Sequence, residues 1–236
     1  MDKYVIITGG GSGSRMNSSI PKQFLEVCGT PILFYSIMAF IKYDPAIKVI
    51  ITLPKPYIDY WKNLITTHKL DVDHILVAGG ETRFQSVKNA LHFVPENKIV
   101  AIHDAVRPFV SLETITNAFN EAMDFHNAIP VVGSIDSVRQ ITQNQNIAMN
   151  RSEVFLVQTP QVFHSSELLQ AYSAQEETVF TDDASVYEAC FNKIHTIAGN
   201  KENSKITTSI DLLMAETMVL SLTDHPSFPH ITFFNR

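Results

Sequence analysis

Short β-branched runs alternate with longer helical patterns along this chain, and this alternation leaves few folds open. The first run, Tyr4 to Thr8, is continuously apolar and ends in glycines, as expected of a strand buried on both faces. Further strands are predicted at 47–53, 74–78, 98–102 and 128–132, with helices at 31–43, 57–68, 83–94 and from Leu112, after an N-cap at Ser111. This order predicts an α/β fold with a doubly wound, mostly parallel sheet. Ligands bind such a sheet at the carboxyl ends of its strands.

The alternation stops between residues 133 and 158, where the sequence becomes polar around a Gln/Asn-rich turn. We expect one Rossmann-like domain over residues 1–236, from which residues 134–158 project as a β-hairpin arm. An extended arm buries little of its own surface, so we expect it to pack on a second subunit; a flexible surface loop is the alternative. Further on, Ser165 or Ser166 and then Thr181 or Asp182 are expected helix caps, and Thr208 opens an expected final helix with a capping box.

The composition excludes several classes of partner. The chain has 236 residues, with 18 Lys and Arg against 24 Asp and Glu, giving a formal net charge of −6. Nothing in this balance favours nucleic acid or an anionic membrane surface. Cys28 and Cys190 match no zinc spacing and are expected to be reduced, partly buried thiols. A cytoplasmic protein is expected.

A glycine-rich loop directly follows the first predicted strand. Its glycines, which let backbone N–H groups approach a phosphate closely, are Gly9, Gly10, Gly11 and Gly13. The loop alone does not identify its ligand. A dinucleotide fingerprint would need a glycine at Ser14 and an acid after Leu53, and a tight turn without a ligand also remains open.

Two cationic residues close to this loop in the sequence reduce the number of ligands that it is expected to bind. Arg15 and Lys22 lie in Gly-Ser-Arg-Met and Pro-Lys-Gln, which resemble the signature of sugar nucleotidyltransferases. Six further motifs follow along the chain: Gly79-Gly80-Glu81-Thr82-Arg83, His103-Asp104-Ala105-Val106-Arg107-Pro108, Arg151, Thr159-Pro160-Gln161, Thr181-Asp182-Asp183-Ala184-Ser185 and Lys205-Ile206-Thr207. They occur in the order found in the 2-C-methyl-D-erythritol 4-phosphate cytidylyltransferase family. The chain resembles this family from Ile6 to Glu216.

This resemblance implies transfer of CMP from CTP to 2-C-methyl-D-erythritol 4-phosphate. It assigns to Arg15 and Lys22 the role of stabilising negative charge in the transition state, and to Arg151 and Lys205 the role of positioning the attacking phosphate. It also implies a homodimer with arm exchange, in which Arg151 acts across the interface. The implied substrate-binding residues are Gly9, Gly10, Gly11, Gly13, Gly80, Glu81, Ser86, Asp104, Ala105, Arg107, Ser137 and Thr159. Cytosine is implied to be recognised by Gly80, Glu81 and Ser86. For Thr159 the alternative is a structural role in a turn.

The expected metal is Mg²⁺ carried by the triphosphate, because the nine histidines show no zinc-ligand spacing. Three alternatives remain at this stage. A ribitol-5-phosphate cytidylyltransferase would share the glycine loop and Pro-Lys-Gln. An NAD(P)-dependent dehydrogenase could use the same kind of sheet, but the expected acid after Leu53 is missing. A catalytically inactive nucleotide-binding module would be expected to lack one of the four catalytic cations.

Overall fold

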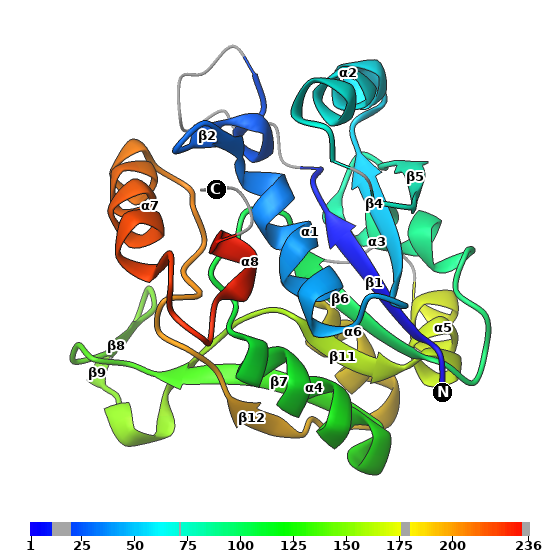
Figure 1. The fold of residues 1–236 in the computed structure, drawn as a ribbon. Coiled ribbons are helices and arrows are strands. Elements are labelled where there is room, and N and C mark those ends of the chain that lie inside the picture. Colours follow the sequence, from blue (N-terminus) through cyan, green and yellow to red (C-terminus); the bar gives the residue numbers. More distant parts are fainter. Residues whose placement is uncertain (11–19, 71, 176–179, 233–236) are drawn as a thin grey trace.

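A mostly parallel central sheet organises the chain. The computed structural model describes residues 1–10, 20–70, 72–175 and 180–232. Its eight-stranded sheet runs in the order β10-β7-β11-β6-β1-β4-β5, with β12 paired to β7 (Figure 1). The parallel core consists of the expected strands: β1 (Lys3–Thr8), β4 (Lys48–Leu53), β5 (His74–Ala78) and β6 (Ile99–Asp104). The predicted α/β fold class is confirmed.

Beyond β6, four strands extend the sheet with mixed direction. β7 (Asn127–Gly133) and β11 (Gln161–His164) pair antiparallel, and β11 is also antiparallel to β6. β10 (Phe155–Val157) pairs antiparallel with β7, whereas β12 (Thr196–Ala198) is parallel to it. A strand was predicted near β7, at residues 128–132, but not at β10 or β11. Both are too short for their alternation to stand out, and β10 is exposed along its whole length.

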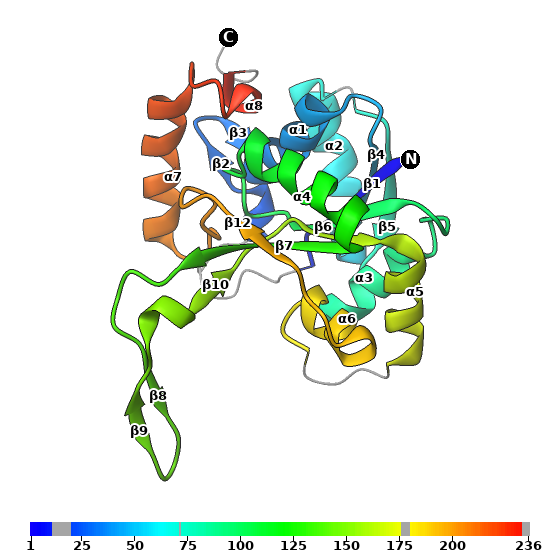
Figure 2. The same cartoon turned by 90° about the horizontal axis from the view of Figure 1, so that it is seen from below.

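Helices cover both faces of the sheet (Figure 2). One face is covered by α1 (Ile32–Tyr43), α2 (Ile58–His68) and α4 (Leu112–Phe125), whose apolar side chains share one core with β1 and β4. The other is covered by α3 (Arg83–Leu91), α5 (Ser165–Ala174) and α6 (Asp183–Phe191), around a second core. The doubly wound arrangement therefore follows from strands that are apolar on both sides.

A third apolar cluster fixes the C-terminal part of the described chain. It joins α7 (Ser209–Leu222) and α8 (Pro229–Thr232) to α1 and the small ribbon of β2 (Glu26–Val27) and β3 (Thr30–Pro31). Thr208 caps α7 with the expected capping box, but α7 is not the last helix, because α8 follows it. Phe228 and Ile231 are buried, so this segment lies against the body of the same chain.

Most of the predicted caps are confirmed, and one is wrong. Ser111 accepts a hydrogen bond from the Thr114 N–H, and Asp182 forms a capping box with Ser185. Ser165 does not cap α5: it is the first residue of that helix and fully buried. Its hydroxyl instead accepts a hydrogen bond from the Lys98 N–H and donates one to the Pro95 carbonyl, which ties α5 to the start of β6. The α5 N-cap is His164, which makes no side-chain cap.

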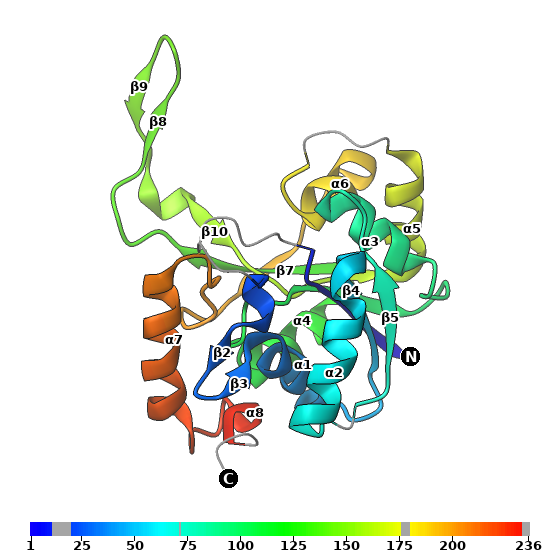
Figure 3. The same cartoon turned by 90° about the horizontal axis from the view of Figure 1, so that it is seen from above.

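The predicted hairpin is present and stands away from the body (Figures 2 and 3). It consists of β8 (Arg139–Ile141) and β9 (Asn146–Ala148), which pair antiparallel and are exposed at every residue. The short helix η4 (Arg151–Glu153) leads from it back to β10. Two short helices near the N-terminal half complete the elements, η2 (Lys22–Phe24) and η3 (Lys55–Tyr57).

No helix in the described ranges is both long and apolar enough to span a membrane. Both cysteines are unpaired, and Cys28 is exposed rather than partly buried as expected, because it lies in the turn between β2 and β3.

Candidate active site

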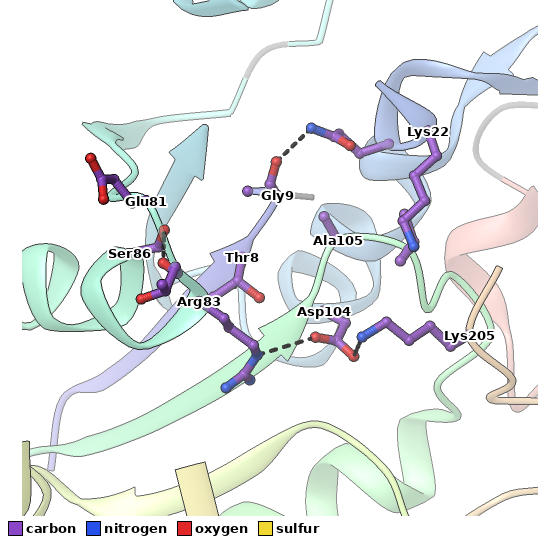
Figure 4. A pocket seen from close by; sticks show the side chains of 13 residues that line it. Thr8, Gly9, Lys22, Glu81, Arg83, Ser86, Asp104, Ala105 and Lys205 are labelled. Atoms are coloured by element: carbon purple, nitrogen blue, oxygen red, sulfur yellow. Dashed lines mark hydrogen bonds and ion pairs between the residues drawn. The ribbon is translucent and has the colours of Figure 1, made fainter. Parts of the chain in front are cut away.

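A cavity at the edge of the sheet lies where the strand order changes direction. From β1 the chain moves to β4 and β5 on one side, and it then returns to place β6 on the other side. The carboxyl ends of β1 and β6 therefore border a crevice, the position at which open α/β sheets bind ligands. A cavity of about 390 Å³ occupies it, lined by Thr8, Gly9, Gly10, Lys22, Gln23, Glu81, Thr82, Arg83, Ser86, Asp104, Ala105, Val106 and Lys205 (Figure 4). We call it the first cavity.

Gly9 forms the floor of this cavity at the end of β1. Its N–H donates to the Thr52 carbonyl at 2.9 Å, so the backbone lies directly against β4. A Cβ at this position would be 2.8 Å from the Leu53 Cδ2 atom and 3.2 Å from the Thr52 oxygen. A larger residue would require the Leu53 side chain to move and the backbone at Thr52 to shift by a few tenths of an ångström, so glycine fits here without adjustment.

Lys22 reaches the first cavity from η2, and the neighbouring residue fixes that short helix. Gln23 is buried, and its side-chain amide donates to the Gly9 carbonyl. Phe24 is buried beside it and makes an edge-to-face contact with Tyr60, with 5.2 Å between the two ring centroids. The turn that carries Lys22 is therefore attached both to the end of β1 and to the core.

The opposite wall is the start of α3. Thr82 caps this helix by accepting from the Gln85 N–H, and Ser86 accepts from the Gly80 N–H at 3.1 Å while donating to the Thr82 carbonyl. These contacts hold the Gly80–Glu81 backbone in a fixed turn at the cavity rim. A Cβ on Gly80 would meet the Gln85 Cβ at 2.3 Å, so this turn also requires glycine.

Asp104, the last residue of β6, carries a nearly buried carboxylate surrounded by cations. Its Oδ2 accepts from the Arg107 Nε at 3.1 Å and lies 3.0 Å from the Lys205 Nζ, and its Oδ1 lies 3.7 Å from the Arg83 Nε. Burial alone would raise the pKa of this carboxyl, but Arg83, Lys205 and Arg107 lower the pKa well below its usual value. Asp104 is therefore ionised and keeps the three cations together.

His103 holds this region from beneath. Its Nε2 lies 3.0 Å from the Arg107 carbonyl, which can only accept, so Nε2 carries the proton. Nδ1 then accepts from the Thr159 hydroxyl at 3.1 Å, and the same hydroxyl oxygen accepts from the Asp104 N–H. Burial lowers the pKa of His103 to about 4, so the ring stays neutral and this chain of bonds is maintained at neutral pH.

A second cavity of about 260 Å³ adjoins the first. It is lined by Arg83, Asp104, Arg107, Val157, Gln158, Thr159, Gln161, Thr181, Asp182 and Lys205. Arg83, Asp104 and Lys205 belong to both walls, so the two cavities meet at the cation cluster.

The structure brings together most of the residues that the sequence analysis selected. The first cavity is lined by Gly9, Gly10, Lys22, Glu81, Ser86, Asp104, Ala105 and Lys205, and the second adds Arg107 and Thr159. Gly80 contributes through its bond to Ser86. Arg15, Gly11 and Gly13 lie outside the described residues. Arg151 and Ser137 lie on the exposed arm and line neither cavity of their own chain; the Arg151 Nη1 donates to the Ile135 carbonyl.

Sequence reasoning did not select Gln23 or Arg83, although both stand inside quoted motifs. For Gln23 the signal was its place directly after Lys22. Nothing in the local sequence distinguished Arg83 from an ordinary surface arginine, because its carboxylate partners, Asp104 and Asp183, are distant in sequence.

Comparison with known proteins agrees with this geometry. Residues 4–221 match the family described as 2-C-methyl-D-erythritol 4-phosphate cytidylyltransferase, IspD. A relative of that name from Bacteroides thetaiotaomicron is 45% identical over 219 residues, covering 93% of this chain and all of the relative. One from Azobacteroides pseudotrichonymphae is 48% identical over 220 residues, covering 92% and 98%. The crystal structure of the Francisella tularensis enzyme of this name superimposes with a TM-score of 0.76 at 31% identity, covering 92% of this chain and 99% of that one.

The chain is thus an enzyme of the nucleotidyltransferase class, which agrees with a cation-lined cavity at the carboxyl edge of the sheet. It belongs to the 2-C-methyl-D-erythritol 4-phosphate cytidylyltransferase family. This membership gives no support to the dehydrogenase alternative.

Two buried histidines predict acid sensitivity. Burial lowers the pKa of His103 and of His230 from 6.5 to about 4. Below about pH 6.5 the unfolded chain takes up protons that the folded chain does not, so the free energy of unfolding decreases as pH falls toward about 4. Between pH 7 and 5 we expect a loss of about 1 to 2 kcal/mol for each histidine. Below about pH 4 both states are protonated and this contribution levels off.

Denaturant unfolding at the two pH values measures this loss. The variant His230→Gln keeps a donor for the Pro108 carbonyl and removes the titrating group. Its decrease in the free energy of unfolding between pH 7 and pH 5 should therefore be smaller than that of the wild type by the contribution of one histidine. Equal losses in the two proteins would contradict the assignment.

The anchoring of Lys22 predicts a graded loss of activity. Lys22→Ala should lower kcat for nucleotidyl transfer about 100-fold or more, because a preorganised donor to developing charge is lost. Gln23→Ala keeps Lys22 but frees its turn from Gly9, and should lower kcat about 10-fold. Steady-state kinetics measures both variants. The exposed Gln170 on α5 provides the matched control Gln170→Ala, and Gln23→Ala kinetics equal to this control would refute the anchoring role.

Proposed function

We propose that this chain transfers CMP from CTP to 2-C-methyl-D-erythritol 4-phosphate, giving 4-diphosphocytidyl-2-C-methyl-D-erythritol and pyrophosphate. The observation that carries the proposal is the pair of adjoining cavities with a shared wall of Arg83, Asp104 and Lys205. A two-substrate phosphoryl transfer needs two binding spaces that meet at the reacting phosphorus, with cations at the meeting point.

The first cavity suits the nucleotide. Its glycine floor carries no side chain, so a phosphate can approach the backbone closely, and the rigid turn at Gly80 and Glu81 offers a few fixed polar groups to a pyrimidine edge. Lys22, together with Arg15, which lies outside the described residues, would stabilise the charge that develops on the α-phosphate and the leaving pyrophosphate.

The second cavity suits the phosphorylated acceptor. Arg107 and Lys205 lie on its wall, already paired with Asp104 and so held in place before substrate arrives. The acceptor phosphate oxygen would attack the α-phosphorus in line, forming a P–O bond while the bond to the pyrophosphate oxygen breaks. No covalent enzyme intermediate is needed, since both substrates can be bound side by side.

Magnesium is proposed as part of the substrate complex with the triphosphate. Among the described residues, no group of three His, Cys, Asp or Glu side chains is arranged to hold a metal. Asp104 is engaged by three cations and thus poorly suited to bind another. The ion would then take its ligands from phosphate oxygens and water, as Mg²⁺ commonly does.

We also propose a single domain over residues 1–236 whose arm, residues 134–158, completes the acceptor site of a second copy in a homodimer. The arm leaves large apolar side chains exposed, among them Ile135, Ile141 and Leu156, as expected of a surface that a partner covers. Arg151 and Ser137 would then reach the partner's second cavity. A cytoplasmic location, with no nucleic-acid or membrane partner, fits small phosphorylated substrates and the acidic composition.

The assignment is tested by measuring pyrophosphate release from CTP with each of two polyol phosphates. We expect turnover with 2-C-methyl-D-erythritol 4-phosphate and a kcat/KM for ribitol 5-phosphate lower by at least about 100-fold, because specific hydroxyl contacts discriminate strongly. Replacing CTP by ATP supplies the nucleotide control. Turnover with ribitol 5-phosphate alone would show the alternative acceptor to be correct.

Arm exchange is tested by mixing two inactive variants, Lys22→Ala and Arg151→Ala. If Arg151 acts in the partner's site, a mixed dimer contains one site with both defects and one intact site. Random reassociation should therefore restore about a quarter of wild-type activity, since half of the dimers are mixed. No recovery after verified subunit exchange would indicate that each site is built within one chain.

A further inference from the structure

Asp183, the first residue of α6, forms a buried ion pair with a cation of the cavity walls. Its carboxylate is fully buried and accepts from the Arg83 Nη1 at 2.9 Å and the Arg83 Nη2 at 2.6 Å, which is a two-pronged, planar contact. The Tyr172 hydroxyl of α5 donates to the same carboxylate at 2.7 Å. Asp183 and Tyr172 are not among the described residues that line either cavity, whereas Arg83 lines both.

This arrangement orients Arg83 more than it stabilises the fold. Burying a carboxylate costs solvation free energy, and a buried ion pair is often no more stabilising than apolar residues of similar size. Arg83 also begins α3, where the helix dipole disfavours a positive charge. What the contact does provide is a fixed plane for the guanidinium, because both terminal nitrogens are engaged along one edge.

The carboxylate itself is held rigidly. Asp182 and Ser185 form the capping box that starts α6. Gln161 of β11 then joins that start to the sheet, with its Nε2 donating to the Asp182 Oδ2 and its Oε1 accepting from the Ala184 N–H, both at 2.8 Å. The position of the Asp183 carboxylate is therefore fixed by the start of α6 and does not adjust to movement of the Arg83 side chain.

The other edge of Arg83 faces the reaction space. Its Nε lies 3.7 Å from the Asp104 carboxylate, at the shared wall of the two cavities (Figure 4). A guanidinium has five N–H donors, and the contact with Asp183 uses one on each terminal nitrogen. The Nε–H faces Asp104, and each terminal nitrogen keeps one N–H that Asp183 does not use. Arg83 therefore retains donors for a ligand at this shared wall, where two phosphorylated substrates would meet.

We propose that Asp183 and Tyr172 are positioning residues that fix Arg83 at the junction of the two cavities, where Arg83 binds a phosphate group of the bound nucleotide. This inference rests on the proposed function. Burial, with Asp183 beside it, raises the pKa of Tyr172 well above its usual value, so its hydroxyl remains a donor throughout the working pH range.

A double-mutant cycle tests whether Asp183 acts through Arg83. Asp183→Asn should lower kcat/KM about 10- to 100-fold and weaken CTP binding, measured by calorimetry with the magnesium complex of CTP. Arg83→Lys keeps the charge but not the planar contact, and should cause a similar loss. In the Arg83→Lys background, Asp183→Asn should cost less than about threefold further, because the contact it supports is already absent. Equal factors in both backgrounds would overturn the inference.

Tyr172→Phe extends the cycle if Asp183→Asn does not fold. It removes one donor and leaves the Arg83 contact in place, so we expect a loss of about three- to fivefold in the wild type and none in Arg83→Lys. The same loss in both backgrounds would again overturn the inference. The matched control is Asp59→Asn, which breaks the exposed pair with Lys62 on α2 and should leave CTP binding unchanged.

The calorimetric readout separates this inference from the proposed function. A wild-type chain that binds no CTP would contradict the proposed function and, with it, the ligand assigned to Arg83. CTP binding by the wild type with additive variant effects would contradict the role of Arg83 and Asp183 alone.

Discussion

The candidate site depends on one buried carboxylate at the end of a central strand. Asp104 lies almost out of contact with solvent and is stable there because Arg83, Arg107 and Lys205 approach it from three different parts of the chain. Since these cations would repel one another without it, Asp104 is the reason that they can be gathered in one small volume. Backbone and hydroxyl bonds from Thr159 and His103 then hold the end of β6 in register with them.

This arrangement reconciles an acidic chain with a site for polyanions. The formal net charge of −6 describes the whole surface, whereas local potential follows from where individual cations stand. Two carboxylates, Asp104 and Asp183, engage Arg83 from opposite edges and keep it from turning toward solvent. The cavities therefore present charges that are already oriented, which reduces the reorganisation required when phosphate groups bind.

The sequence predicted the parallel strands, their order along the chain, the hairpin and half of the residues lining the two cavities, because each has a local signature. Continuous apolar runs identified β1, β4 and β6, and glycines identified the turns at Gly9 and Gly80. The contact between Arg83 and Asp183 has no such signature, since one hundred residues separate the partners and only the packing of α3, α5 and α6 on one face brings them together. The expected cap at Ser165 or Ser166 is wrong because the partners of Ser165, the N–H of Lys98 and the carbonyl of Pro95, are distant in sequence and leave no local pattern.

The shared wall of the two cavities has a thermodynamic consequence. Lys205 and Arg83 face both spaces, so an anion in one space changes the field experienced by an anion in the other. By linkage, whatever the first ligand does to the affinity of the second, the second does equally to the first. If the two spaces hold the two proposed substrates, their binding is therefore coupled, and a small molecule bound in one space changes the affinity of the other.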